Sequence, residues 1–217
     1  MLSKIKAVIF DMDGVLIDAR DWHYEALNKA LNLFGMEISR YDHLVTYDGL
    51  PTKKKLEMLT IERGLPRRLH SFINDMKQQY TMELVHTRCK PTFNHQFALS
   101  RLRADGYRMA VCSNAIRKSI EVMLDKAGLQ PFIDFTLSAE DVSRPKPYPD
   151  MYAAAISRLG VEASECLIVE DNENGIKAAL ASGAHLMRVF SVTEVNYQQV
   201  KERIGYIEQG KAAEVTL

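Results

Sequence analysis

Two aspartates, Asp11 and Asp13, stand one residue apart at the end of an apolar run that spans residues 5–10. The run is rich in β-branched and aromatic residues, which is typical of a short buried strand. In an open α/β sheet, ligands bind at the carboxyl ends of the strands. Two carboxylates this close repel each other unless a cation or a reaction uses them. The pattern therefore predicts a metal site and a nucleophile in the same place.

Three further polar segments each follow a predicted strand or lie in a loop: Ser113-Asn114, Arg144-Pro145-Lys146-Pro147 and Glu170-Asp171. Alone, each has an ordinary explanation, such as a helix cap at Ser113 or a solvated loop lysine. In a parallel sheet the strand ends lie on one edge, so carboxylates, a hydroxyl and an ammonium are expected to converge there. Carboxylates bind Mg²⁺ or attack phosphorus, and an ammonium offsets the charge of a phosphoryl group. Together the segments predict phosphoryl transfer.

Strands and helices are predicted to alternate between these segments. Apolar runs of strand length occur at 107–112, 132–137, 166–170 and 185–189. Helices are expected between them: one capped by Asn94 and ending at Gly106, one ending near Gly128, and others near 150–160, 175–182 and 195–204. Such alternation implies a parallel sheet with right-handed crossovers. The predicted fold class is α/β, a Rossmann-like parallel sheet with helices on both faces.

Residues 18–88 follow a different pattern, with apolar residues at helical spacing and no convincing strand. Helices are expected at 22–34, after Ser39, from Pro51 to Gly64 and from Pro66 to Tyr80. We therefore predict an α/β core domain made of residues 1–17 and 89–217, and an all-helical cap domain of residues 18–88 inserted after the first strand. The tail after Gly205 is polar and is expected to be ordered only in part.

The composition argues against several classes of protein. Among 217 residues, 28 Lys and Arg balance 28 Asp and Glu, so the net charge gives no sign of a nucleic-acid partner. The three cysteines are far apart and form no Cys-x-x-Cys pair, which argues against a zinc site or a disulfide framework. No apolar run reaches membrane-spanning length, and the first is too short for a signal peptide. A cytoplasmic protein without a membrane partner is expected; no pattern sets the oligomeric state, and a monomer is the default.

In this order, the four polar segments resemble the four motifs of the haloacid dehalogenase (HAD) superfamily. The similarity is greatest to the subgroup with a helical cap after the first strand, which includes β-phosphoglucomutase and many small-molecule phosphatases. It covers nearly the whole chain. It rests on Asp-Met-Asp-Gly-Val-Leu-Ile-Asp, Pro-Lys-Pro-x-Pro-Asp and Val-Glu-Asp-Asn-x-x-Gly-Ile-x-Ala-Ala, which are weak singly but highly specific as a set.

The resemblance implies roles for the acidic residues. Asp11 would be the nucleophile, and Asp13 the general acid that protonates the leaving oxygen and then activates water. Mg²⁺ would be held by the Asp11 carboxylate, the Asp13 backbone carbonyl and Asp171. Glu170 would assist either directly or through water.

The resemblance also implies how the phosphoryl group is held. Ser113 would bind it, with Asn114 beside the serine, and Lys146 would bridge the nucleophile and the phosphoryl oxygens. These three residues and the acidic residues would make up the site of the core domain.

Substrate binding is expected to involve the helical insert, where His23, Thr52 and Lys55 are the candidates. His23 matches a histidine of β-phosphoglucomutase, although a partly exposed helix histidine is an equally good explanation. Thr52 stands where the mutase has an arginine that holds the second phosphate of its substrate. The run Lys53–Lys55 would supply positive charge instead, although a solvated helix face is the simpler explanation.

These departures favour a phosphatase over a mutase. We predict a Mg²⁺-dependent phosphatase that hydrolyses a small phosphomonoester, such as a sugar phosphate, through an aspartyl-phosphate. A β-phosphoglucomutase-like sugar phosphomutase is the alternative. A non-catalytic regulator that binds a phosphorylated ligand is disfavoured, because Asp11, Asp13, Lys146 and Asp171 are all present.

Overall fold

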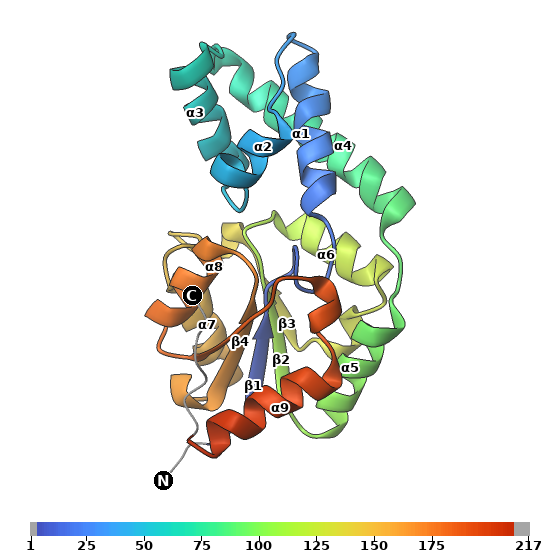
Figure 1. The fold of residues 1–217 in the computed structure, drawn as a ribbon, viewed down its shortest axis with the longest axis vertical. Helices are drawn as coiled ribbons and strands as arrows, with labels where there is room; N and C mark the ends of the chain where they lie inside the picture. The colour runs from blue at the N-terminus through green and yellow to red at the C-terminus, as the bar shows by residue number, and fades with distance from the viewer. Residues whose placement is uncertain (1–3, 211–217) are drawn as a thin grey trace. The chain divides into compact units, whose positions relative to one another are not determined.

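The computed structural model describes residues 4–210, which form two compact units (Figure 1). One unit consists of the chain before Ala19 and after Cys89, and the other is Ala19–Cys89. The boundaries drawn from the sequence lie one residue from these. That each unit is an independently folding domain stays a prediction.

The first unit is built on a five-stranded parallel sheet. Its strands are β1 (Ala7–Phe10), β2 (Arg108–Cys112), β3 (Phe135–Leu137), β4 (Cys166–Glu170) and β5 (His185–Arg188). The order β3-β2-β1-β4-β5 puts β1 in the centre, with β2 on one side and β4 on the other. From β1 the chain first adds β2 and β3 on one side of the sheet, and later adds β4 and β5 on the other side. Such a topological switch point is where open α/β sheets bind ligands.

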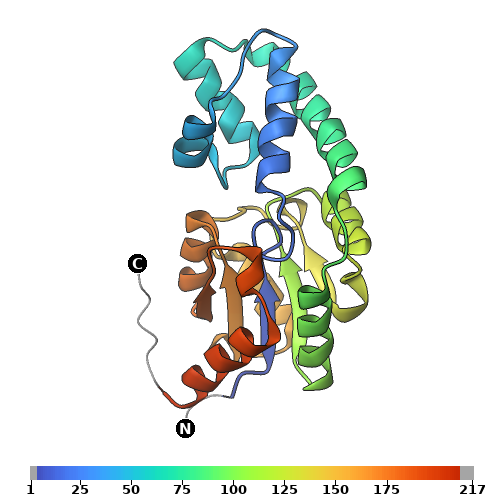
Figure 2. The same ribbon diagram turned by 45° about the vertical axis from the view of Figure 1, so that its right-hand side comes forward.

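Helices cover both faces of this sheet, as Figures 1 and 2 show. On one side lie α7 (Asp150–Leu159) and α8 (Glu173–Ala181). On the other lie α5 (Phe93–Ala104), α6 (Arg117–Lys126) and α9 (Tyr197–Glu208). Short 3₁₀ turns occur at Gln130–Phe132, Ala139–Asp141, Ala163–Glu165 and Val192–Glu194. The predicted Rossmann-like α/β fold is confirmed.

The core of the first unit explains why its strands are short apolar runs. All residues of β1 and β4 are buried, as expected for a parallel sheet covered on both faces. Ala7 and Ile9 of β1 point to the same face and pack in one cluster with Tyr152 and Ala155 of α7. This packing fixes the direction of β1 and therefore the place where its last residue meets the following loop.

The second unit is entirely helical. It contains α1 (Arg20–Asn32), α2 (Arg40–Asp42), a π-helical segment His43–Tyr47, α3 (Thr52–Arg63), a 3₁₀ turn Arg67–Leu69 and α4 (His70–Arg88). Its own apolar core includes Leu27 and Leu31 of α1, Leu56 and Leu59 of α3 and Ile73 of α4. The predicted all-helical insert after the first strand is confirmed.

Several predicted element boundaries are wrong. A 3₁₀ turn follows Pro66, and α4 then extends to Arg88 instead of ending near Tyr80. The start of α5 is Phe93, so Asn94 lies inside the helix rather than at its cap. α9 continues past Gly205 to Glu208, and the last part of the polar tail, residues 211–217, lies outside the described residues. Among residues 4–210, no helix combines the length and the apolar character needed to cross a membrane.

Candidate active site

Asp11 is the first residue after β1, and the sheet holds its backbone in place. Its amide donates a hydrogen bond to the Val169 carbonyl of β4 (3.0 Å), which continues the ladder beyond the end of β1. The chain then turns tightly, with the Gly14 amide bonded to the Ile17 carbonyl (2.7 Å). Gly14 has φ +90°, and a Cβ there would lie 2.1 Å from Oδ2 of Asp171. Only glycine therefore allows the turn and the close approach of Asp171.

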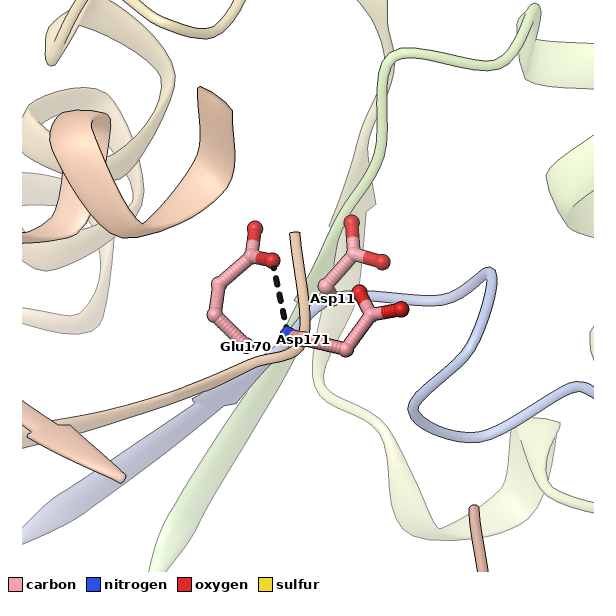
Figure 3. Close-up of side chains that lie close together, drawn as sticks. All are labelled: Asp11, Glu170 and Asp171. Carbon is pink, nitrogen blue, oxygen red and sulfur yellow. Dashed lines mark hydrogen bonds between the residues drawn. The ribbon is translucent and has the colours of Figure 1, made fainter. Parts of the chain in front are cut away.

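Three carboxylates meet at the carboxyl ends of β1 and β4 (Figure 3). Oxygen atoms of Asp11, Glu170 and Asp171, one from each, all lie within 4.8 Å of one another. With Lys146 bonded to two of them, the ionised groups would carry a formal charge of −3 + 1 = −2. An all-oxygen donor set with this charge fits a hard divalent cation such as Mg²⁺. Asp13 does not belong to this side-chain group, and its expected contribution to the metal is the backbone carbonyl alone.

Lys146 is buried and uses all three of its ammonium protons within the protein. Nζ donates to Oδ1 of Asp11 (2.6 Å), to the backbone carbonyl of Cys112 (2.8 Å) and to Oε1 of Glu170 (2.7 Å). Since an ammonium has three donors, each proton has an acceptor. Lys146 thus joins β1, β2 and β4 and fixes the orientation of the Asp11 carboxylate.

Glu170, the last residue of β4, is held at both carboxylate oxygens. Oε1 accepts from Lys146 and from the hydroxyl of Tyr152 in α7 (2.5 Å). Oε2 accepts from the backbone amides of Asp171 (3.1 Å) and Asn172 (3.4 Å). A Cβ at Gly175 would lie 1.7 Å from Oε1, so α8 leaves room for this carboxylate only through a glycine. Glu170 is therefore fixed in one orientation.

Burial and charge pull the pKa values of these groups in different directions. Burial raises the pKa of Asp11 well above its usual range; the Lys146 ammonium opposes that rise, and the neighbouring carboxylates add to it. Burial alone would lower the pKa of Lys146, but Asp11 and Glu170 raise it above its usual value. The pKa of Tyr152 is also raised, by burial and by Glu170, so its hydroxyl stays a donor. A cation beside Asp11 would favour the ionised nucleophile.

Ser113 and Asn114 follow β2, as expected, but their side chains have different partners. Ser113 is buried, and its Oγ accepts a hydrogen bond from the Ala115 amide (3.0 Å), which leaves its hydroxyl proton as a donor. The Asn114 side chain makes two reciprocal hydrogen bonds with the Lys146 backbone, donating to its carbonyl (3.1 Å) and accepting from its amide (3.0 Å). Asn114 thus fixes the loop that carries Lys146.

The remaining candidates belong to the second unit. His23 lies in α1, with Nδ1 3.3 Å from Nζ of Lys77 in α4. Thr52 is the first residue of α3 and is half-buried. Lys55 in the next turn is buried, whereas Lys53 and Lys54 are exposed, so the lysine run is only in part a solvated face. Substrate binding by His23, Thr52 and Lys55 stays a prediction.

Comparisons with known proteins agree with this geometry. The sequence model of the haloacid dehalogenase-like hydrolase family matches residues 8–189. The chain belongs to this family. It is 26% identical over 186 residues to a fructose-1-phosphate phosphatase of Escherichia coli, covering 84% of this chain and 95% of that one. It is 25% identical over 191 residues to a phosphorylated carbohydrates phosphatase of Thermotoga maritima, covering 87% and 85%.

A β-phosphoglucomutase of Clostridium difficile has the same fold as this chain. The TM-score is 0.79 at 20% sequence identity, covering 93% of this chain and 97% of that one. That likeness concerns the fold. The family match over residues 8–189 confirms the predicted HAD superfamily membership, and with the phosphatase relatives it confirms the prediction of a hydrolase.

Two contacts of this HAD site have no signal in the amino-acid sequence. Tyr152 is an apolar-face residue of α7 by its spacing, and no sequence signal connects its hydroxyl to Glu170. The two hydrogen bonds between the Asn114 side chain and the Lys146 backbone join residues 32 positions apart, and they depend on the path of the loop before α7. Both contacts position residues that the motifs had already singled out.

Proposed function

We propose that this HAD-family protein is a Mg²⁺-dependent phosphatase that hydrolyses a small phosphomonoester, such as a sugar phosphate. The main support is the buried Asp11 carboxylate, held by the Lys146 ammonium at 2.6 Å beside Glu170 and Asp171. A fixed carboxylate next to a cation site suits nucleophilic attack on phosphorus. The phosphatase names of relatives at 25–26% identity also support the proposal.

The proposed metal ligands are the Asp11 and Asp171 carboxylates and the Asp13 backbone carbonyl, with Glu170 contributing directly or through water. Bound Mg²⁺ would supply positive charge that offsets the carboxylates and the phosphoryl oxygens. Lys146 adds to this charge, and its fixed contacts keep Asp11 aligned. The Ser113 hydroxyl is the proposed donor to a phosphoryl oxygen.

The proposed reaction has two displacements at phosphorus. A carboxylate oxygen of Asp11 attacks, the bond between phosphorus and the ester oxygen breaks, and Asp13 gives its proton to the departing oxygen. The product is an aspartyl-phosphate and a free alcohol. Asp13, now ionised, takes a proton from water, whose oxygen attacks phosphorus and releases inorganic phosphate from Asp11.

Phosphate release from a panel of phosphomonoesters with Mg²⁺ tests this proposal. Asp11→Asn should reduce turnover by at least about 10³-fold, because an amide is not a nucleophile here. Asp125→Asn, an exposed site on α6, is the matched control and should keep full turnover. Full activity in Asp11→Asn would contradict the mechanism.

The same assay separates the alternatives. Glucose 1-phosphate isomerisation, followed through a coupled dehydrogenase, reports mutase activity. Efficient isomerisation without net phosphate release would overturn the phosphatase in favour of the mutase. A protein inert toward the whole panel would favour a non-catalytic regulator.

A further inference from the structure

Tyr152 brings a hydroxyl into a cluster of buried apolar side chains between α7 and the sheet. It lies in the first turn of α7, is fully buried, and packs with Ala7 and Ile9 of β1. A buried tyrosine normally finds a partner for its hydroxyl. Here the partner is not a backbone carbonyl but the Glu170 carboxylate, at 2.5 Å.

The oxygen that Tyr152 contacts is the oxygen that holds Lys146. Oε1 of Glu170 accepts from the Tyr152 hydroxyl and from Nζ of Lys146 (2.7 Å), and Nζ in turn donates to Oδ1 of Asp11 (2.6 Å). The Lys146 ammonium also lies 4.7 Å from the centre of the Tyr152 ring. Tyr152 therefore binds Glu170 and lies beside Lys146, the residue that holds the proposed nucleophile.

We propose that Tyr152 is a positioning residue of the active site, an inference that rests on the proposed function. Its hydroxyl fixes the Glu170 carboxylate in the orientation that presents Oε1 to Lys146. Lys146 then holds Asp11 in line for attack on phosphorus. Hydrogen bonds to charged groups are among the stronger ones in proteins, and small misalignments of reacting groups slow catalysis greatly.

Tyr152→Phe removes the hydroxyl and keeps the ring that packs against β1. We expect kcat to fall about tenfold while KM stays within about twofold, because alignment is lost and binding is not. Tyr197→Phe is the control, because it removes another tyrosine–carboxylate hydrogen bond of the same unit, from Tyr197 to Asp105 (2.8 Å). Asp105 precedes the amino end of β2, whereas the candidate site lies at the carboxyl ends of the strands. It should leave kcat and KM unchanged.

A double variant tests whether Tyr152 acts through Glu170. If it does, Tyr152→Phe combined with Glu170→Gln should have the kcat of Glu170→Gln alone. Independent, multiplying losses would overturn the proposal, and so would an unchanged kcat in Tyr152→Phe.

A measurement without substrate keeps this test separate from the proposed function. The buried ammonium of Lys146 should give a slowly exchanging ¹H–¹⁵N signal, assigned by its absence in Lys146→Arg. The signal should exchange faster with water in Tyr152→Phe and stay unchanged in Tyr197→Phe. An unchanged signal in Tyr152→Phe overturns the positioning role. If the wild type releases no phosphate but the Lys146 signal still exchanges faster in Tyr152→Phe, only the proposed phosphatase is contradicted.

Discussion

The pKa of His43, in the second unit, is changed by burial and by nearby charges. This histidine lies in the π-helical segment and is only 1% exposed. Burial and the Lys55 ammonium lower the pKa of His43 to about 4, and Arg40 and His23 act in the same direction. Asp48 opposes them, with an oxygen 3.8 Å from Nε2 of His43. His43 is therefore neutral near pH 7, and its protonation works against the native state.

The lowered pKa predicts that acid weakens the second unit. An unfolded histidine has a pKa of about 6.5, above the folded value, so the contribution of His43 is fully present above about pH 6.5 and is lost as pH falls toward 4. Between about pH 7 and about pH 4.5 the loss should be about 2–3 kcal/mol of unfolding free energy. Urea melts followed by fluorescence of Trp22, the one tryptophan in the chain, measure it.

His43→Gln has no imidazole to protonate. Between about pH 7 and about pH 4.5, its unfolding free energy should therefore fall by about 2–3 kcal/mol less than that of the wild type. His86→Gln, which changes an exposed histidine on α4, should behave like the wild type. Equal losses in His43→Gln and wild type would show that other groups cause the acid sensitivity.

Two glycines inside helices differ in what surrounds them. In α8, Gly175 leaves space for the Glu170 carboxylate, which a Cβ would meet at 1.7 Å. In α9, apart from the adjoining residues and backbone of the helix itself, no atom of the described residues lies within 4 Å of a Cβ built at Gly205. Gly175→Ala should therefore cost about 1–3 kcal/mol of unfolding free energy, because Glu170 must move. Gly205→Ala should add about 0.5–1 kcal/mol, since alanine favours a helix. Urea melts measure both changes in unfolding free energy. Changes of the same sign in both variants would contradict this explanation.

The order and type of the helices and strands of the first unit could be predicted from the sequence, because strand and helix periodicities differ clearly in this part of the chain. The residues at which helices begin and end were harder to predict. α4 continues to Arg88 because Lys77, Thr81 and Val85 keep the spacing that buries one helix face, although two of them are polar. Asn94 is a good capping residue by type, but the chain is already helical at Phe93. Local preference cannot reveal such tertiary effects.

The candidate site was predictable as a set of residues but not as a set of contacts. The motifs and the parallel topology together indicate that Asp11, Lys146 and Asp171 approach one another. They do not indicate that all three Lys146 protons go to protein oxygens, nor that Tyr152 supplies a donor. Those facts depend on side-chain directions set by packing between α7 and the sheet.

Each of the two units of the molecule has an apolar core of its own. In the second unit, Ile73 of α4 is fully buried in the cluster with Leu27 and Leu56. In the first, Ile120 of α6 is fully buried. A core confined to one unit stabilises that unit directly, so damage to it should stay local if the units unfold separately.

Hydrogen exchange read by mass spectrometry tests this independence. Ile73→Ala should destabilise its unit by about 2–5 kcal/mol, because it leaves a cavity. Exchange should then speed up in α1, α3 and α4, while β1 and β4 stay protected. Ile120→Ala is the reciprocal change and should speed exchange in the first unit only. If either variant raised exchange equally in both units, the chain would unfold as one cooperative body, and the predicted division into two domains would fail.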